Sequence, residues 1–181
     1  MLCEHGYSGM TTTIVAESAG VSQGALYKHF GSKHQLVAAT TEHLFARLIE
    51  EFRRVFATGG SEDERISVAL RELWAIFVMP ELYAVLELYM AARTVEPLRQ
   101  ALLPVLLIHR ENLMSEARRF FPEAAANNPR FVECVDAVMM AMQGAAISAA
   151  VVPELKDGSQ VVPFLEYLAK REFETPYGVE E

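Results

Sequence analysis

The sequence predicts an all-α protein. Apolar residues recur every three or four positions over long stretches, as they do on the buried face of a helix. Residues typical of helix ends separate these stretches, with Ser and Thr at the starts and Gly, Pro and Asn at the breaks. None of the stretches shows the alternation of apolar and polar residues that is typical of a strand. These three observations favour helices throughout the 181 residues.

Residues 11–31 give the first two helices. Thr11 and Ser22 are strong N-caps, because their hydroxyl groups can accept a hydrogen bond from a free amide of the following turn. Gly20 can adopt the positive φ that ends one helix and turns the chain into the next. Val21 is expected to be a buried residue of this turn. Gly31 ends the second helix.

The later helices follow from the same signals. Ser32 caps a long helix, and Ser61 heads three acidic residues in a first turn, where the helix dipole favours them. Prolines and an Asn-Asn-Pro break at 127–129 separate the rest. Helices are therefore expected over residues 12–19, 23–30, 32–56, 61–79, 80–93, 96–121, 130–152 and 159–173, with a break at Thr58–Gly60.

The second helix has two different faces. Leu26 and Phe30 are spaced by four residues and pack inward, so Tyr27, Lys28 and His29 point outward. Gln23 and Gly24 lie in its first turn, which is where the second helix of a helix-turn-helix contacts the edges of DNA bases. A glycine is costly inside a helix, and close approach to DNA would explain Gly24.

This segment resembles the DNA-binding signature of the TetR family of bacterial transcription regulators. The matching residues are Thr11-Thr12, Val15-Ala16, Ala19-Gly20-Val21-Ser22, Gly24-Ala25-Leu26-Tyr27, His29-Phe30, Ser32-Lys33 and Leu36. Gly6-Tyr7 is similar to the pair that closes the family's first helix. Because only Met1–His5 precede this pair, that helix is expected to be largely missing from the three-helix unit. The resemblance implies a helix-turn-helix DNA-binding domain over 1–45 and a helical ligand-binding and dimerisation domain over 46–181.

The resemblance also implies roles for individual residues. Gln23 and Gly24 would contact base edges of double-stranded operator DNA. The side chains that would hold phosphates are Thr11, Thr12, Ser22, Tyr27, Lys28, His29 and Lys33. The net charge is −8, but no acidic residue lies between Glu17 and Glu42, where two lysines and two histidines occur. This segment is therefore locally cationic, and a phosphate responds to local charge within a Debye length of about 8–10 Å.

The rest of the chain suggests a ligand pocket and a dimer interface. Met and aromatic residues can line an adaptable apolar cavity, and plain core packing is the alternative for most of them. The expected pocket residues are Trp74, Phe77, Leu86, Tyr89, Met90, Arg93, His109 and Met114. The resemblance implies a homodimer built from the last two helices, with Met140, Gly144, Ala145, Ser148, Phe164 and Leu168 at the contact; an ordinary core helix is the alternative.

An enzyme is not expected. The sequence has no Gly-rich phosphate loop, no His-Glu-x-x-His motif and no Gly-x-Ser-x-Gly motif, so we expect no catalytic residue, cofactor or metal. Cys3 and Cys134 are far apart and imply neither a disulfide framework nor a zinc site. With neither a signal peptide nor a membrane span expected, the cytoplasm is the expected location.

The sequence thus predicts a DNA-binding transcriptional regulator, a repressor released by an apolar or aromatic inducer. The alternative is a dimeric ligand-binding protein whose DNA binding is impaired by its short N-terminus.

Overall fold

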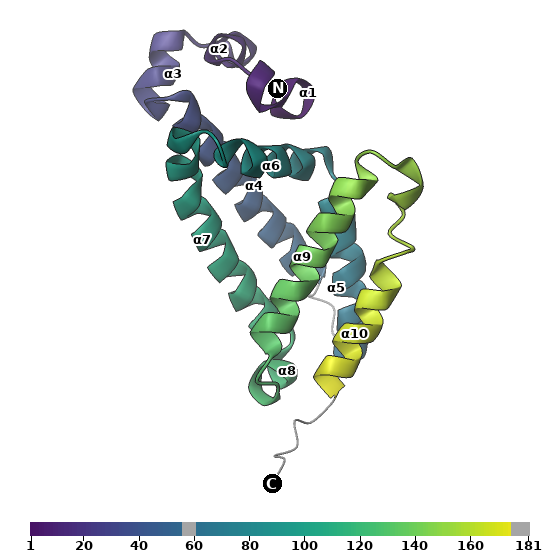
Figure 1. Ribbon diagram of the computed structural model, residues 1–181. Helices are drawn as coiled ribbons and strands as arrows, with labels where there is room; N and C mark the ends of the chain where they lie inside the picture. Colours follow the sequence, from purple (N-terminus) through teal and green to yellow (C-terminus); the bar gives the residue numbers. More distant parts are fainter. Residues whose placement is uncertain (56–60, 175–181) are drawn as a thin grey trace. The chain divides into compact units, whose positions relative to one another are not determined.

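The computed structural model describes residues 1–55 and 61–174 (Figure 1). Over these ranges it contains α-helices and one short 3-10 helix but no strand, which confirms the all-α prediction. The predicted break at Thr58–Gly60 lies outside the described residues. The chain forms two compact units, of which unit 1 comprises 1–48 and 80–110 and unit 2 comprises 49–79 and 111–181.

Unit 1 contains the helix-turn-helix together with parts of three longer helices. Its short helices are α1 (Leu2–Gly9), α2 (Thr12–Ala19) and α3 (Gln23–Phe30). It also contains the first part of α4 (Lys33–Val55), all of α6 (Pro80–Ala92) and the first part of α7 (Glu96–Phe120). Only one turn of α1 precedes Gly6, where the helix is kinked.

Two of the buried apolar clusters in the described part of unit 1 connect its helices. The smaller one joins α2, α3 and α4 through Ala16, Leu26 and Leu36, with Phe30 packed beside it, as the helical spacing predicts. The larger one joins α1 and α4 to α6 and α7, and its buried members are Tyr7, Met10, Val37, Ala38, Leu88, Leu98 and Leu102. The prediction for Val21 is wrong: its side chain is 44% exposed, because the turn between α2 and α3 lies at the surface.

The larger cluster makes unit 1 different from the predicted domain 1–45. Residues 80–110 pack with the helix-turn-helix because α6 contributes Leu88 and α7 contributes Leu98 and Leu102 to the same core as Tyr7. The predicted domains separate DNA binding from ligand binding and dimerisation, whereas the two units are defined by compactness. The functional boundary at residue 45 therefore remains a prediction.

Unit 2 is built around three helices that pack on one another, α5 (Glu62–Phe77), α9 (Phe131–Ala149) and α10 (Val162–Glu174). Ser61 caps α5 as predicted, since its hydroxyl accepts from the Glu64 amide and the Glu64 carboxylate accepts from the Ser61 amide. The sequence did not reveal α8 (Pro122–Asn127) or the 3-10 turn Pro153–Leu155, because both are too short to show a period.

Candidate nucleic-acid interface

The geometry between α2 and α3 is that of a helix-turn-helix. Gly20 has φ 67° and ψ 27°, the left-handed conformation that the turn requires. The Thr11 hydroxyl accepts from the Ile14 amide at 3.2 Å, and the Ser22 hydroxyl accepts from the Ala25 amide at 3.1 Å. Both helix starts are thus capped as predicted. Each hydroxyl keeps its own O–H, which remains available to donate to a phosphate oxygen.

The outer face of α3 carries polar and cationic side chains. Gln23, Tyr27, Lys28 and His29 are all exposed, whereas Leu26 is buried. This arrangement confirms that the helix packs through one face and leaves the other for solvent or a partner. The contacts of these residues with DNA remain a prediction.

Two side-chain hydrogen bonds connect α2 with this face. The hydroxyl of Thr12 lies 3.0 Å from that of Tyr27, and the side-chain amide of Gln23 donates to the hydroxyl of Thr13. Sequence reasoning missed Thr13. It follows Thr11 and Thr12, which have predicted roles, and nothing in the sequence distinguishes it from them as a partner for Gln23. Gln23, the predicted reader of bases, is therefore held by the preceding helix.

No steric contact within the described part of the protein requires glycine at position 24. A Cβ atom built on it would have only the Ser22 hydroxyl oxygen nearby, at 3.9 Å, which is ordinary contact. The helix would therefore accept alanine at this position. The structure thus leaves close approach of a partner as a reason for the glycine.

Lys33 is used inside unit 1. Its Nζ donates to the Tyr7 carbonyl oxygen at 2.6 Å and lies 4.3 Å from the centre of the Tyr7 ring. Burial lowers the pKa of the Lys33 ammonium. Since an ammonium group has three donors, a phosphate contact would come in addition to this internal one.

The predicted pocket residues divide between the two units. Leu86, Tyr89, Met90, Arg93 and His109 belong to unit 1, and Trp74, Phe77 and Met114 belong to unit 2. Trp74 is buried and donates to the Lys156 carbonyl oxygen at 2.9 Å, which is a structural role. Met90 is 63% exposed and Arg93 is exposed. The pocket as a whole remains a prediction.

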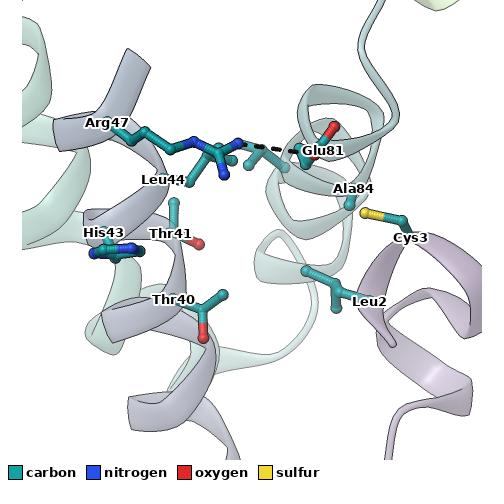
Figure 2. A pocket seen from close by; sticks show the side chains of 10 residues that line it. Leu2, Cys3, Thr40, Thr41, His43, Leu44, Arg47, Glu81 and Ala84 are labelled. Atoms are coloured by element: carbon teal, nitrogen blue, oxygen red, sulfur yellow. Dashed lines mark ion pairs between the residues drawn. The ribbon is translucent and has the colours of Figure 1, made fainter. Parts of the chain in front are cut away.

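Unit 1 contains a hollow of about 180 Å³ between α1, α4 and α6 (Figure 2). Leu2 and Cys3 line it from one side, and Arg47 and Glu81 meet at its edge, 3.8 Å apart. None of the eight predicted pocket residues lines this hollow.

His109 has the most unusual environment among the predicted pocket residues. Its ring stacks on Phe45 with 3.6 Å between ring centres, and its Nδ1 is buried without a hydrogen-bond partner. The Tyr83 hydroxyl of the same unit is likewise buried and unpaired. Burial lowers the pKa of His109 to about 4, so the imidazole is neutral at pH 7.

This burial predicts a loss of stability in mild acid. The unfolded chain takes up a proton near pH 6.5, whereas folded His109 resists it until about pH 4. Neutral His109 therefore contributes fully to the free energy of unfolding above pH 6.5. This contribution falls by about 2–3 kcal/mol as the pH is lowered towards 4. We expect His109→Gln to flatten the dependence of unfolding free energy on pH between 7 and 5. His43→Gln, at an exposed position on α4, is the matched control; equal slopes in wild type and His109→Gln would contradict the assignment.

The predicted dimer residues lie on an exposed apolar surface of unit 2. Met140, Gly144 and Ser148 of α9 are exposed and Ala145 is half-buried, while Met142, Ala146 and Ala149 are buried on the other side of that helix. On α10, Phe164 and Leu168 are exposed. Sequence reasoning missed three neighbours that are also exposed, Ile147, Val151 and Tyr167. We call this set the α9–α10 face.

Composition alone would also allow a membrane span here. Helix α9 is long and apolar enough to cross a membrane, and α5 and α6 pass the same test only as a bent pair. The core helix of a globular protein passes the same test. Within the described ranges, no group of three or more His, Cys, Asp or Glu side chains could hold a metal ion.

Comparison with known proteins agrees with this geometry. The model of the bacterial regulatory proteins of the tetR family matches residues 1–40. An uncharacterized HTH-type transcriptional regulator of Mycobacterium tuberculosis, Rv2912c, is 29% identical over 167 residues, which cover 92% of this chain and 86% of the relative. The regulator CymR of Pseudomonas putida is 33% identical over 56% of this chain and 50% of its own length.

Shorter similarity links the chain to a repressor. The HTH-type transcriptional repressor AcnR of Corynebacterium efficiens is 43% identical over 47 residues, 26% of this chain and 25% of AcnR. No solved structure matches the chain.

Proposed function

We propose that this chain, which is a member of the TetR family and thus a DNA-binding transcriptional regulator, acts as a homodimeric repressor that a small apolar or aromatic molecule releases from its operator. The observation that carries the proposal is the capped α2–turn–α3 unit, with an exposed polar face on α3, inside the segment that matches the family. The name of AcnR, a repressor, supports repression as the mode of regulation.

At the DNA, α3 enters the major groove by its first turn. Gln23 and Gly24 then face base edges, and the hydroxyl and cationic groups around them contact phosphates on either side. The absence of acidic residues between Glu17 and Glu42 favours this approach, because nothing in that stretch repels a phosphate.

The α9–α10 face supports a homodimer. Exposed apolar side chains on two adjacent helices lose contact with water when a second copy covers them, and small residues such as Gly144 let the helices approach closely. A two-fold dimer also presents two copies of α3, which matches the two half-sites of a palindromic operator.

Release by a ligand requires only that the ligand binds one arrangement of the dimer more tightly than the other. The buried, unpaired Nδ1 of His109 and hydroxyl of Tyr83 support a ligand in this part of the chain, since each would gain a hydrogen bond from a polar group on it. Because His109 is neutral at pH 7, an uncharged polar group suits it best.

Gly24→Ala should separate stability from DNA binding. Alanine fits the free helix, so the unfolding free energy should stay the same or rise by roughly 0.5–1 kcal/mol. The added methyl group lies where α3 approaches DNA, so affinity for operator and random DNA should fall. Thermal unfolding and a mobility shift measure the two effects, and unchanged DNA affinity would show that Gly24 does not lie against DNA.

A mobility shift with the DNA upstream of the chain's own gene tests the proposed function. A specific complex should form in the presence of competitor DNA and weaken as salt is raised, since phosphate contacts release counterions. Absence of any complex under these conditions would contradict the proposal and favour the ligand-binding alternative.

A further inference from the structure

The turn between the two parts of α1 is held by a carboxylate from far along the chain. Gly6, with φ 62° and ψ 178°, interrupts the helix. The next amide, that of Tyr7, donates to Oε1 of Glu87 on α6 at 2.7 Å. A hydrogen bond to a charged acceptor is stronger than one between neutral groups.

Gly6 makes this contact possible in two ways. Its positive φ is a conformation that other residues rarely adopt. A Cβ atom at this position would also lie 2.7 and 2.9 Å from the two carboxylate oxygens of Glu87. Both the backbone conformation and the space beside it thus fit the carboxylate.

The other side of the Tyr7 residue is held by a cation. Its carbonyl oxygen accepts from Nζ of Lys33 at 2.6 Å, and its ring is buried against residues of α4, α6 and α7. The amide of Tyr7 therefore faces an anion and its carbonyl faces a cation. Lys33 opens α4, three residues after the end of α3 at Phe30.

We infer that Glu87 is a positioning residue for DNA binding, although it lies outside the helix-turn-helix. Its carboxylate fixes Tyr7, Tyr7 fixes the ammonium of Lys33, and Lys33 fixes the start of α4, three residues after the end of α3. Glu87 is on the same helix, α6, as Leu86 and Tyr89, two of the predicted pocket residues, so a ligand that moves α6 would act on this contact. The inference rests on the proposed function.

The expected effect follows from the strength of the contact. Loss of a hydrogen bond to a charged group shifts a local opening equilibrium by roughly 10- to 100-fold. Affinity for DNA falls in proportion to the fraction of molecules in the competent arrangement. We expect this loss of affinity to be roughly fivefold or more. Because the contact with Glu87 reads no base, operator and random DNA should be affected alike.

The experiment compares four variants of the full chain. Glu87→Ala removes the acceptor, Glu87→Asp keeps the charge but withdraws it from Tyr7, and Glu87→Gln keeps an acceptor oxygen at the same reach. Glu81→Gln, on the same helix but paired with Arg47, is the matched control. Hydrogen exchange of the Tyr7 amide and affinity for both DNAs are measured for each, well below the melting temperature.

We expect faster exchange at Tyr7 and weaker DNA binding in Glu87→Ala and Glu87→Asp, partial recovery of both in Glu87→Gln, whose acceptor is neutral, and no change in Glu81→Gln. A merely structural role would lower the melting temperature without changing the affinity of the folded protein. Should Glu87→Ala fail to fold, Glu87→Asp decides, and binding equal to wild type overturns the inference. If the unaltered chain binds no DNA, the proposed function fails as well; if it binds and all variants bind equally, the inference fails alone.

Discussion

Replacing Gly144 by arginine is expected to convert the proposed dimer into monomers and to weaken operator binding by at least about 100-fold. A dimer that binds two half-sites has an affinity roughly 10²–10⁴ times that of a monomer bound to one half-site, and a monomeric variant loses this gain. Nothing lies within 4 Å of a Cβ atom at Gly144, so arginine fits the free subunit. In a close contact between two copies, however, it would place bulk and an unpaired charge among Met140, Ile147 and Phe164 of the α9–α10 face.

Sedimentation at micromolar concentration and a mobility shift measure these effects. Ser115→Arg, at an exposed position of α7 in the same unit, is the matched control, because it adds the same charge on a helix other than α9 and α10. It should leave both the dimer and operator affinity unchanged. A sedimenting species of 20.2 kDa for the unaltered chain would contradict the dimer and, with it, the two half-sites.

Local chemistry made the helix-turn-helix predictable. Thr11, Ser22 and Gly20 act within three or four residues of themselves, so their caps and turn are visible in the sequence and appear as expected. The inward position of Leu26 follows from helical spacing in the same way. Helix starts at Ser61 and Pro80 were equally clear.

Contacts over long distances were not predictable. Nothing in residues 80–110 indicates that Leu88 and Leu98 share a core with Tyr7, because the period of a helix shows its apolar face but not what covers it. The same reason hid the contact between Glu87 and the Tyr7 amide, which joins residues 80 positions apart in the sequence. Val21 was misplaced because apolar character alone does not decide burial in a turn, and exposed apolar residues are common.

Roles at the DNA lie between these two cases. The sequence indicated which side chains of α3 point outward, and the structure adds how they are held. Gln23 is fixed by Thr13, and Lys33 by Tyr7. A residue held in one orientation loses less conformational freedom on binding, so these contacts favour a surface that is ordered before DNA arrives.

The second large effect is expected for Gln23→Ala, which should weaken operator binding by roughly 1–3 kcal/mol and change affinity for random DNA little. A side-chain amide reads a base edge with its donor and acceptor, and the hydrogen bond to Thr13 occupies only part of this capacity. Titration of both DNAs at two salt concentrations measures the effect.

Lys28→Ala is the matched comparison on the same helix face. A phosphate contact carries no sequence information, so this variant should weaken both DNAs alike and reduce the slope of log affinity against log salt by about one. Gln23→Ala should leave that slope unchanged, because an uncharged amide releases no counterion. Equal loss on operator and random DNA in Gln23→Ala, or no loss on either, would mean that Gln23 serves only the contact between α2 and α3.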